Sequence, residues 1–392
     1  MHETTTQPDW LMRLDSPWAA VAITAALYAL FIGLRLHKLD YDVSRFVLAG
    51  DEFCDPQRVP EGLSVWRDSS GYDGQFYYRL ALDPLTTQAT AYGVTLDVPP
   101  YRQQRIGYPL LARGLAFGRE RWIPISMLLV NFAGICGVAW FAAAYVRRMK
   151  AHALLGLLAA CYPGFVLTLA RDLTEIVEIC FLLAGLLAFR RGHGFAAGAS
   201  FAAAVLCKET SLLAVGALAV VPLVDWVRHP RPRVRLTMLA MLPPLLVFGA
   251  WQLYLRWRWG LFPVAAGDGN IGPPLVGLTR FVHDVLSTDG PGVHDYWLAL
   301  LVFLAVFVVF VVLALPTTRA GAEIILAWLL YGGLALSLTD VVWVEHWAFM
   351  RALSEFYVLG ALILAGSRVR ARPAFLVIAA VAWTVVMRAS RA

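Results

Sequence analysis

Residues 122–146 read WIPISMLLVNFAGICGVAWFAAAYV, a stretch of 25 residues without a charged side chain, and Arg147 and Arg148 follow it. An α-helix of about 20 apolar residues crosses the hydrocarbon core of a bilayer and satisfies its own backbone polar groups. Similar stretches recur along all 392 residues, of which 59% are hydrophobic and 15% charged. An average soluble domain carries about 25% charged residues. The sequence therefore predicts an integral membrane protein.

We expect a polytopic, all-α transmembrane bundle in one integral membrane domain, residues 1–392, with about eleven spans. The expected spans are 17–37, 122–146, 152–170, 173–189, 193–207, 210–226, 236–255, 296–315, 321–338, 351–367 and 373–388. No small-residue cleavage site follows the first stretch, which favours a retained span over a signal peptide.

A connection of about 80 residues, 38–120, follows the first span, and a loop of this length is expected to be functional. Two of its segments, 75–83 and 101–117, combine apolar residues with tyrosines or arginines. Amphipathic helices of this kind lie in the headgroup plane of a membrane. We therefore expect a first loop with juxtamembrane interfacial helices.

Basic residues alternate between the connections. Fourteen of them fall in the N-terminal tail and one set of short connections: Arg13, Arg147, Arg148, Lys150, Arg190, Arg191, Arg228, Arg231, Arg233, Arg235, Arg319, Arg368, Arg370 and Arg372. The opposite set carries six: Arg171, Lys208, Arg256, Arg258, Arg280 and Arg351. The more basic side faces the cytoplasm. This rule places the N-terminus inside and the 38–120 loop outside, although Arg388 and Arg391 then lie outside against the rule.

The 38–120 loop contains Gly71-Tyr72-Asp73-Gly74-Gln75-Phe76-Tyr77-Tyr78-Arg79. Asp73 directly precedes an expected helix, where the helix dipole keeps a carboxylate ionised. We interpret Asp73 as a candidate general base that acts at the membrane surface. The alternative is that Asp73 caps the helix, since aspartate is a favoured N-cap residue. One carboxylate can fill both roles.

Residues of both charge signs occur in four outer connections. They include Asp51, Glu52, Asp73, Arg79 and Arg105; Arg171, Asp172, Glu175 and Glu178; Lys208 and Glu209; and Asp340, Glu345, His346, Arg351 and Glu355. Charges at membrane depth are costly, so they face a cavity or a partner. The alternative is that these residues form ion pairs with one another at helix ends, which would explain any one of them. Their occurrence in all four connections favours a shared polar cavity that opens outward.

The order of these features resembles the GT-C superfamily of membrane glycosyltransferases, and residues 71–78 followed by Leu80-Ala81 resemble the first-loop motif of its mannosyltransferase-type members. The resemblance implies that Asp73 is the general base, that the donor is a polyprenyl-phosphate sugar, and that transfer inverts the sugar's configuration. It also implies a second acidic residue, for which Asp51, Glu52, Asp172 and Glu175 are the candidates.

A lipid phosphate that leaves needs fixed cations to stabilise its charge. We expect Arg105, Arg171, Lys208 and Arg351 to bind it. The expected substrate-lining residues are Tyr72, Gln75, Tyr77, Arg79, Glu209, Glu345 and His346. A simple interfacial histidine is an alternative reading of His346. The charge of Asp51, Asp73 and Glu175 would suit a divalent ion, but no spacing points to a metal site, and no cofactor is expected.

The leading hypothesis is an inverting glycosyltransferase of a bacterial inner membrane. Its partners would be a polyprenyl-phosphate-linked sugar, a cell-envelope glycan or glycolipid acceptor, and membrane lipids. Nucleic acid is not expected, because topology explains the net charge of +6. A transporter or flippase of lipid-linked sugars is the first alternative; it would show related halves and ionisable residues at the bilayer midplane. A non-catalytic scaffold of a polysaccharide assembly complex is the second.

Overall fold

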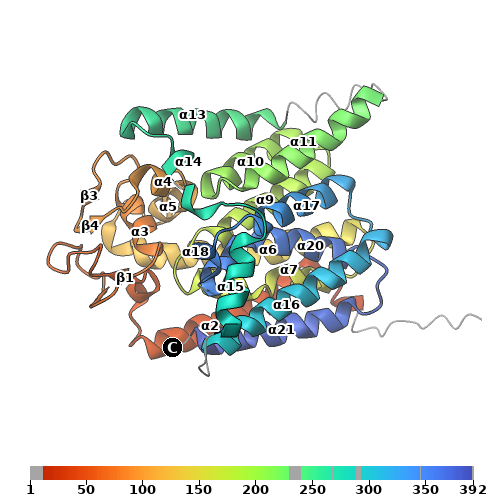
Figure 1. Cartoon of the computed structure of the whole chain (residues 1–392), viewed down its shortest axis with the longest axis horizontal. Coiled ribbons are helices and arrows are strands. Elements are labelled where there is room, and N and C mark those ends of the chain that lie inside the picture. The colour runs from red at the N-terminus through yellow and green to blue at the C-terminus, as the bar shows by residue number, and fades with distance from the viewer. Residues whose placement is uncertain (1–11, 229–239, 267, 288–292, 345, 391–392) are drawn as a thin grey trace, which may run out of the picture.

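The structure is a computed structural model that describes residues 12–228, 240–266, 268–287, 293–344 and 346–390. Helices dominate these residues, which confirms the predicted all-α class (Figure 1). Two short ladders occur within the first loop. They pair β1 (Ala49–Gly50) with β2 (Val65–Trp66), in parallel, and β3 (Thr90–Ala91) with β4 (Val94–Thr95), antiparallel.

The long helices follow the predicted spans. They are α2 (Pro17–Lys38), α6 (Ile123–Arg148), α9 (Glu175–Arg190), α10 (Gly194–Cys207), α11 (Ser211–Arg228), α13 (Leu242–Trp259), α16 (Val293–Ala314), α17 (Ala322–Leu336), α20 (Ser354–Ala365) and α21 (Arg372–Ala389). Four segments of the described chain are long and apolar enough to cross a membrane: Pro17–Lys38, Glu120–Arg148, Tyr296–Thr317 and Arg372–Ala389. The chain is therefore a membrane protein with several spanning helices.

The predicted span 152–170 is not one continuous helix. It is divided into η3 (Ala153–Gly156), α7 (Leu157–Ala160) and α8 (Pro163–Leu169). Pro163 begins α8 and lacks the backbone N–H that would continue the preceding turn. The segment is buried along its length, so neighbouring helices cover the interrupted backbone.

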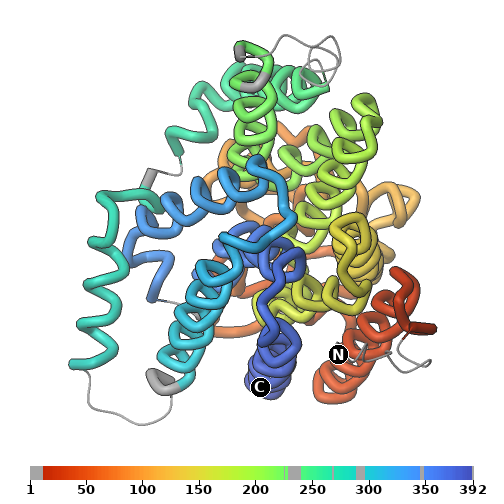
Figure 2. Tube along the Cα trace, turned by 90° about the vertical axis from the view of Figure 1, so that its right-hand side faces the viewer, coloured from red at the N-terminus to blue at the C-terminus, as the bar shows by residue number. Residues whose placement is uncertain are grey.

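Long helices such as α2 and α21 run between two ends of the molecule, which lie left and right in Figure 1, whereas α15 (Val276–Ser287) runs across the view in Figure 2. At one end, Asp15 lies 3.8 Å from Arg147 and accepts a hydrogen bond from the backbone N–H of Ala153. We call this the basic end. At the other end, the loop end, Arg35 donates to the backbone oxygens of Ala170 and Ser390.

The first loop packs onto the loop end, and its first predicted helix is not interfacial. All nine residues of α3 (Gly74–Leu82) are buried beneath the rest of the loop. The predicted helix 101–117 is divided into α4 (Pro99–Gln103) and α5 (Gly107–Leu115). Only α5 exposes an apolar face, formed by Leu110, Leu111 and Leu115.

Candidate active site

A cavity of about 400 Å³ lies at the loop end. We call it the loop-end cavity. Its lining comes from the first loop, the start of α9, the α10–α11 turn and the segments around α17 to α19 (His346–Ala352). The polar lining residues are Tyr72, Asp73, Tyr101, Gln104, Arg105, Glu175, Lys208, Glu209, Thr210, Asn270 and Arg351. Regions as far apart in sequence as Tyr72 and Arg351 thus supply one polar surface.

Asp73 occupies the N-cap position of α3, but its side chain makes no capping hydrogen bond. Its carboxylate forms two ion pairs instead. Oδ1 lies 2.8 Å from Nη1 of Arg102, and Oδ2 lies 2.6 Å from Nη2 of Arg351. Only 8% of the residue is exposed. The capping alternative therefore does not explain the side chain of Asp73.

The two guanidinium groups decide the ionisation of Asp73. Burial raises the pKa of its carboxyl, but Arg102 and then Arg351 lower it by more, and the pKa lies well below its usual range. Asp73 is therefore ionised at neutral pH. In this paired state it is a weak base, because a low pKa means a low affinity for protons. A role in proton abstraction requires that one arginine moves away.

Arg351 is the more exchangeable of the two partners. Its Nε lies 3.8 Å from Oε1 of Glu175, and its guanidinium lies over the ring of Tyr72, 5.1 Å from the centroid. Arg351 lines the cavity, whereas Arg102 is anchored outside it by Asp97, at 2.6 Å and 2.8 Å. A ligand in the cavity can therefore contact Arg351 directly.

Two further cations of the cavity are also paired with carboxylates. Arg105 and Glu209 form a bidentate pair with distances of 2.6 Å and 3.0 Å. Burial lowers the pKa of Arg105, but Glu209 raises it by more. Lys208 lies 2.8 Å from Glu355, and both side chains are at least 94% buried. The cavity thus holds preorganised cations whose charges are balanced by the protein.

A further part of the cavity wall is apolar. It consists of Val264, Ile271, Leu334, Leu338, Val341, Val342, Ala348 and Ala352. Val341 and Ile271 are more than half exposed, so this wall continues to the surface of the molecule. A ligand with a charged group and a long hydrocarbon chain would match both walls.

The structure brings together seven of the residues that the sequence analysis selected. Tyr72, Asp73, Arg105, Glu175, Lys208, Glu209 and Arg351 all line the loop-end cavity. Among the acidic candidates, Glu175 is therefore the second carboxylate beside Asp73. The sequence analysis did not select Arg102, which pairs with Asp73, or Glu355, which pairs with Lys208, as site residues. Both occur in charged segments that it did note, but no spacing identified their partners.

Asp51 and Glu52 lie elsewhere. They line a separate hollow within the first loop, together with residues such as Asp55 and Tyr92. The carboxylate of Asp51 accepts hydrogen bonds from the backbone N–H groups of Asp68 and Ser69, both at 3.0 Å. Asp51 therefore stabilises the loop and does not reach the cavity.

Three residues of the motif after Asp73 are structural and do not line the cavity. Gln75 connects loop segments, because it accepts from the backbone N–H of Gly50 and donates to Ser70. Arg79 is fully buried and donates to Thr86 Oγ1 at 2.7 Å. Tyr77 packs edge-on against Tyr108. Since every side of α3 is covered, its side chains hold the loop together.

Asp172 and Arg171 lie behind the cavity wall. Asp172 is fully buried and accepts a hydrogen bond from Tyr108 at 3.4 Å. Burial raises the pKa of the Asp172 carboxyl, which favours its neutral form. The guanidinium of Arg171 lies 5.5 Å from the ring centroid of Tyr72, on which Arg351 also packs. Arg171 therefore contributes positive charge to the site without lining the cavity.

Glu345 lies outside the described residues, and so does the side chain of His346, whose backbone begins α19. Among the described residues, no group of three or more His, Cys, Asp or Glu side chains is placed to hold a metal ion. Two carboxylates of the cavity, Asp73 and Glu175, both lie close to the guanidinium of Arg351.

No protein-family model matches the chain, and no curated protein is significantly similar to it.

Proposed function

We propose that the protein is an inverting glycosyltransferase that uses a polyprenyl-phosphate sugar. The observation that carries the proposal is the mixed lining of the loop-end cavity, which combines Asp73 and three cations with apolar side chains that continue to the surface. A polyprenyl phosphate has the same division between a charged group and a hydrocarbon chain. The donor phosphate would contact Arg351, Arg105 and Lys208, and the prenyl chain would lie on the apolar wall.

Donor binding would change the partner of Arg351. A phosphate group accepts two hydrogen bonds from a guanidinium in bidentate geometry. Movement of Arg351 from Asp73 to the donor phosphate would remove one of the charges that lower the pKa of Asp73. The carboxylate would then be a stronger base when the donor is bound.

The reaction would proceed in one displacement. The acceptor hydroxyl oxygen forms a bond to the anomeric carbon, and the bond from that carbon to the phosphate oxygen breaks. The electron pair leaves with the polyprenyl phosphate, and the hydroxyl proton passes to Asp73. Fixed cations stabilise the leaving phosphate, and the carboxylate supplies general-base catalysis of about 10²–10⁴-fold.

We further propose the architecture and location that this reaction needs. Eleven helical passages, including the divided segment 153–169, would cross a bacterial inner membrane in a GT-C-like arrangement. The basic end would face the cytoplasm because it carries Arg147, Arg190 and Arg319. The loop-end cavity would then open at the outer leaflet, where a lipid-linked donor and a glycan or glycolipid acceptor are both present.

Incubation of the purified protein with radiolabelled polyprenyl-phosphate sugars and a membrane lipid extract tests the proposal. We expect label to move to a new lipid or glycan product. Movement of intact donor across proteoliposomes without a product would support transport instead. Donor that is neither transferred nor moved would support a scaffold. A control with Asp73→Asn should lower product formation by about 10²–10⁴-fold, whereas Asp40→Asn should match the parent, because Asp40 is an exposed carboxylate with left-handed backbone that asparagine tolerates.

A further inference from the structure

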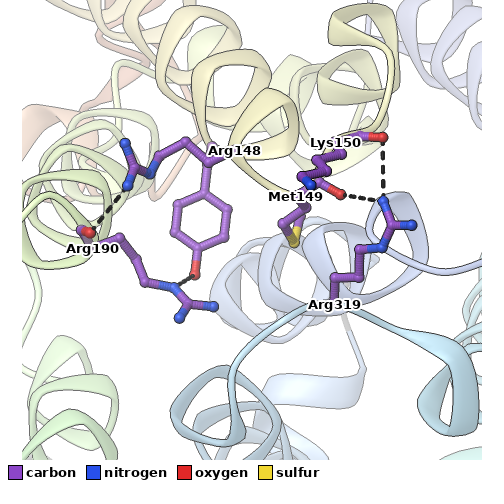
Figure 3. Close-up of a pocket in the computed structure, with 6 residues that line it drawn as sticks. Arg148, Met149, Lys150, Arg190 and Arg319 are labelled. Carbon is purple, nitrogen blue, oxygen red and sulfur yellow. Dashed lines mark hydrogen bonds between the residues drawn. The ribbon is translucent and has the colours of Figure 1, made fainter.

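A second cavity, of about 470 Å³, lies at the basic end. We call it the basic pocket. Figure 3 shows cationic side chains around it that come from three separate segments of the chain. Its lining residues are Tyr145, Arg148, Met149, Lys150, Arg190 and Arg319. Tyr145 and Met149 are buried, so the floor of the pocket is part of the packed bundle, while the cations line its open side.

The arginines of the basic pocket are held in place by the protein. Nε of Arg190 donates to the hydroxyl of Tyr145 at 3.0 Å, and Arg319 donates to the backbone oxygen of Met149 at 2.9 Å. Arg148 donates to the backbone oxygen of Arg190 at 3.4 Å. Each guanidinium carries five N–H groups. These bonds therefore fix the orientation of the side chains and leave further donors for a ligand.

The charge of the basic pocket is not balanced by its lining. Among the residues that the structure describes, four cations line it and no carboxylate does. Glu323, beside Arg190 at 3.5 Å, offsets one of the four charges. Like charges at close range repel one another. An anion in the pocket would relieve this repulsion and accept charge-assisted hydrogen bonds.

The position of the basic pocket identifies the source of the anion. Helix α9 runs from Glu175 in the loop-end cavity to Arg190 in the basic pocket, a rise of about 24 Å over its 16 residues. The two sites therefore lie at opposite ends of α9, which in the orientation proposed above places them near opposite faces of the membrane. Val312 and Leu313, in the last turn of α16, are exposed apolar residues that precede Arg319 by a few residues in the sequence. Acyl chains would occupy such a surface.

We propose that the basic pocket binds the phosphate of an anionic lipid headgroup from the leaflet at the basic end. Arg148, Arg190 and Arg319 would donate to the phosphate oxygens, and Lys150 would act as a point charge. Basic pockets between membrane helices bind phosphate-bearing headgroups by these contacts. This site is separate from the loop-end cavity and is independent of the reaction proposed there.

The test uses the full-length protein in a neutral detergent and measures heat of binding. The probes are short-chain phosphatidylglycerol, short-chain phosphatidylcholine and inorganic phosphate. The variant is Arg148→Gln/Lys150→Gln, because both side chains are exposed and the change should not disturb packing. The matched control is Arg368→Gln/Arg370→Gln, which removes the same charge from exposed residues outside the pocket lining.

We expect phosphatidylglycerol to bind the parent and the control equally. The variant should bind it about 30-fold more weakly, or about fivefold for each cation removed. Phosphatidylcholine and inorganic phosphate should both bind the parent at least about tenfold more weakly than phosphatidylglycerol. Equal weakening in variant and control would overturn the proposal, since general surface charge would then explain binding. Inorganic phosphate that binds as tightly as the lipid would also overturn it.

Discussion

The loop-end cavity and the basic pocket lie at opposite ends of α9 and both gather arginine and lysine, but the charges have different partners in the two sites. In the loop-end cavity, Arg105, Lys208 and Arg351 each have a carboxylate partner within 3 Å. In the basic pocket, backbone oxygens and a tyrosine hydroxyl hold the arginines, and no carboxylate of the described residues lines the space. The first site is electrically balanced when empty, and the second is not.

Because of this difference, a ligand of the loop-end cavity must exchange with a carboxylate, whereas the basic pocket attracts an anion without such an exchange. A ligand of the loop-end cavity must replace an existing partner, so its binding changes the protonation of the carboxylate that is released. A ligand of the basic pocket replaces only water and mobile ions. The first arrangement suits the proposed sugar transfer, and the second suits the binding of an anionic lipid headgroup.

Removal of one cation from each site should affect stability very differently. Lys208→Met leaves Glu355 buried without its ammonium partner, and we expect a loss of about 3–5 kcal/mol. Arg148→Met at the exposed basic pocket should change stability by less than about 0.5 kcal/mol. Thermal and denaturant unfolding in detergent would measure both. Similar losses for the two variants would contradict the comparison.

A smaller effect should come from the close packing beneath Asp73. A Cβ added at Gly74 would lie 2.3 Å from the backbone oxygen of Arg171 and 2.6 Å from that of Val47. Gly74→Ala should therefore cost about 1–3 kcal/mol and reduce transfer, because Asp73 precedes it. Gly33→Ala is the control: its Cβ would meet nothing within 4 Å, and alanine in a helix should stabilise by about 0.5–1 kcal/mol. Unfolding and transfer assays on both variants check this, and a neutral Gly74→Ala would show that the loop adjusts freely.

The sequence predicted much of the fold and part of the site. Apolar stretches located the helices, because every span must satisfy its own backbone in lipid. Charges in the outer connections identified Glu175, Lys208 and Arg351 as neighbours of Asp73, since charges near a bilayer need a common polar space. The sequence could not show which charges pair.

For the motif after Asp73, the sequence predicts a helix but does not determine whether that helix is exposed or buried. A short segment with tyrosines and an arginine reads equally as an interfacial helix or as a buried one, because tertiary packing decides which faces are covered. The structure buries Arg79 completely, with Thr86 as its partner. The carboxylate of Asp51 likewise accepts hydrogen bonds from backbone N–H groups of the loop. Residue patterns and spacings in the sequence do not reveal such hydrogen-bond partners.

The exchange of Arg351 should appear in the pH dependence of transfer. The low pKa of Asp73 in the free protein means that kcat/KM, which reports the free enzyme, should lack an acid limb above about pH 4. The acid limb of kcat, which reports the donor complex, should lie at higher pH. Arg351→Gln removes one of the charges that lower this pKa, so it should move the acid limb of kcat/KM upward.

A control with Arg121→Gln, at an exposed position directly after the first loop, should leave both pH profiles unchanged. The ion pairs of Asp73 stabilise the fold at every pH above the carboxyl's unfolded pKa of about 3.9 and are lost as the pH falls through its lower folded value. The contribution of these ion pairs to stability is therefore constant across the range in which the profiles are recorded. Coincident acid limbs for kcat and kcat/KM would argue against the exchange.

The most direct test of the account compares donor binding and sugar transfer in Asp73→Asn, with both measured on the same preparation. We expect the variant to bind polyprenyl-phosphate sugar at least as tightly as the parent, because Arg351 no longer has to leave a carboxylate. Transfer should fall by about 10²–10⁴-fold, which is the contribution of a general base. Transfer at the parental rate would show that Asp73 is not the base, and the proposed mechanism would be wrong.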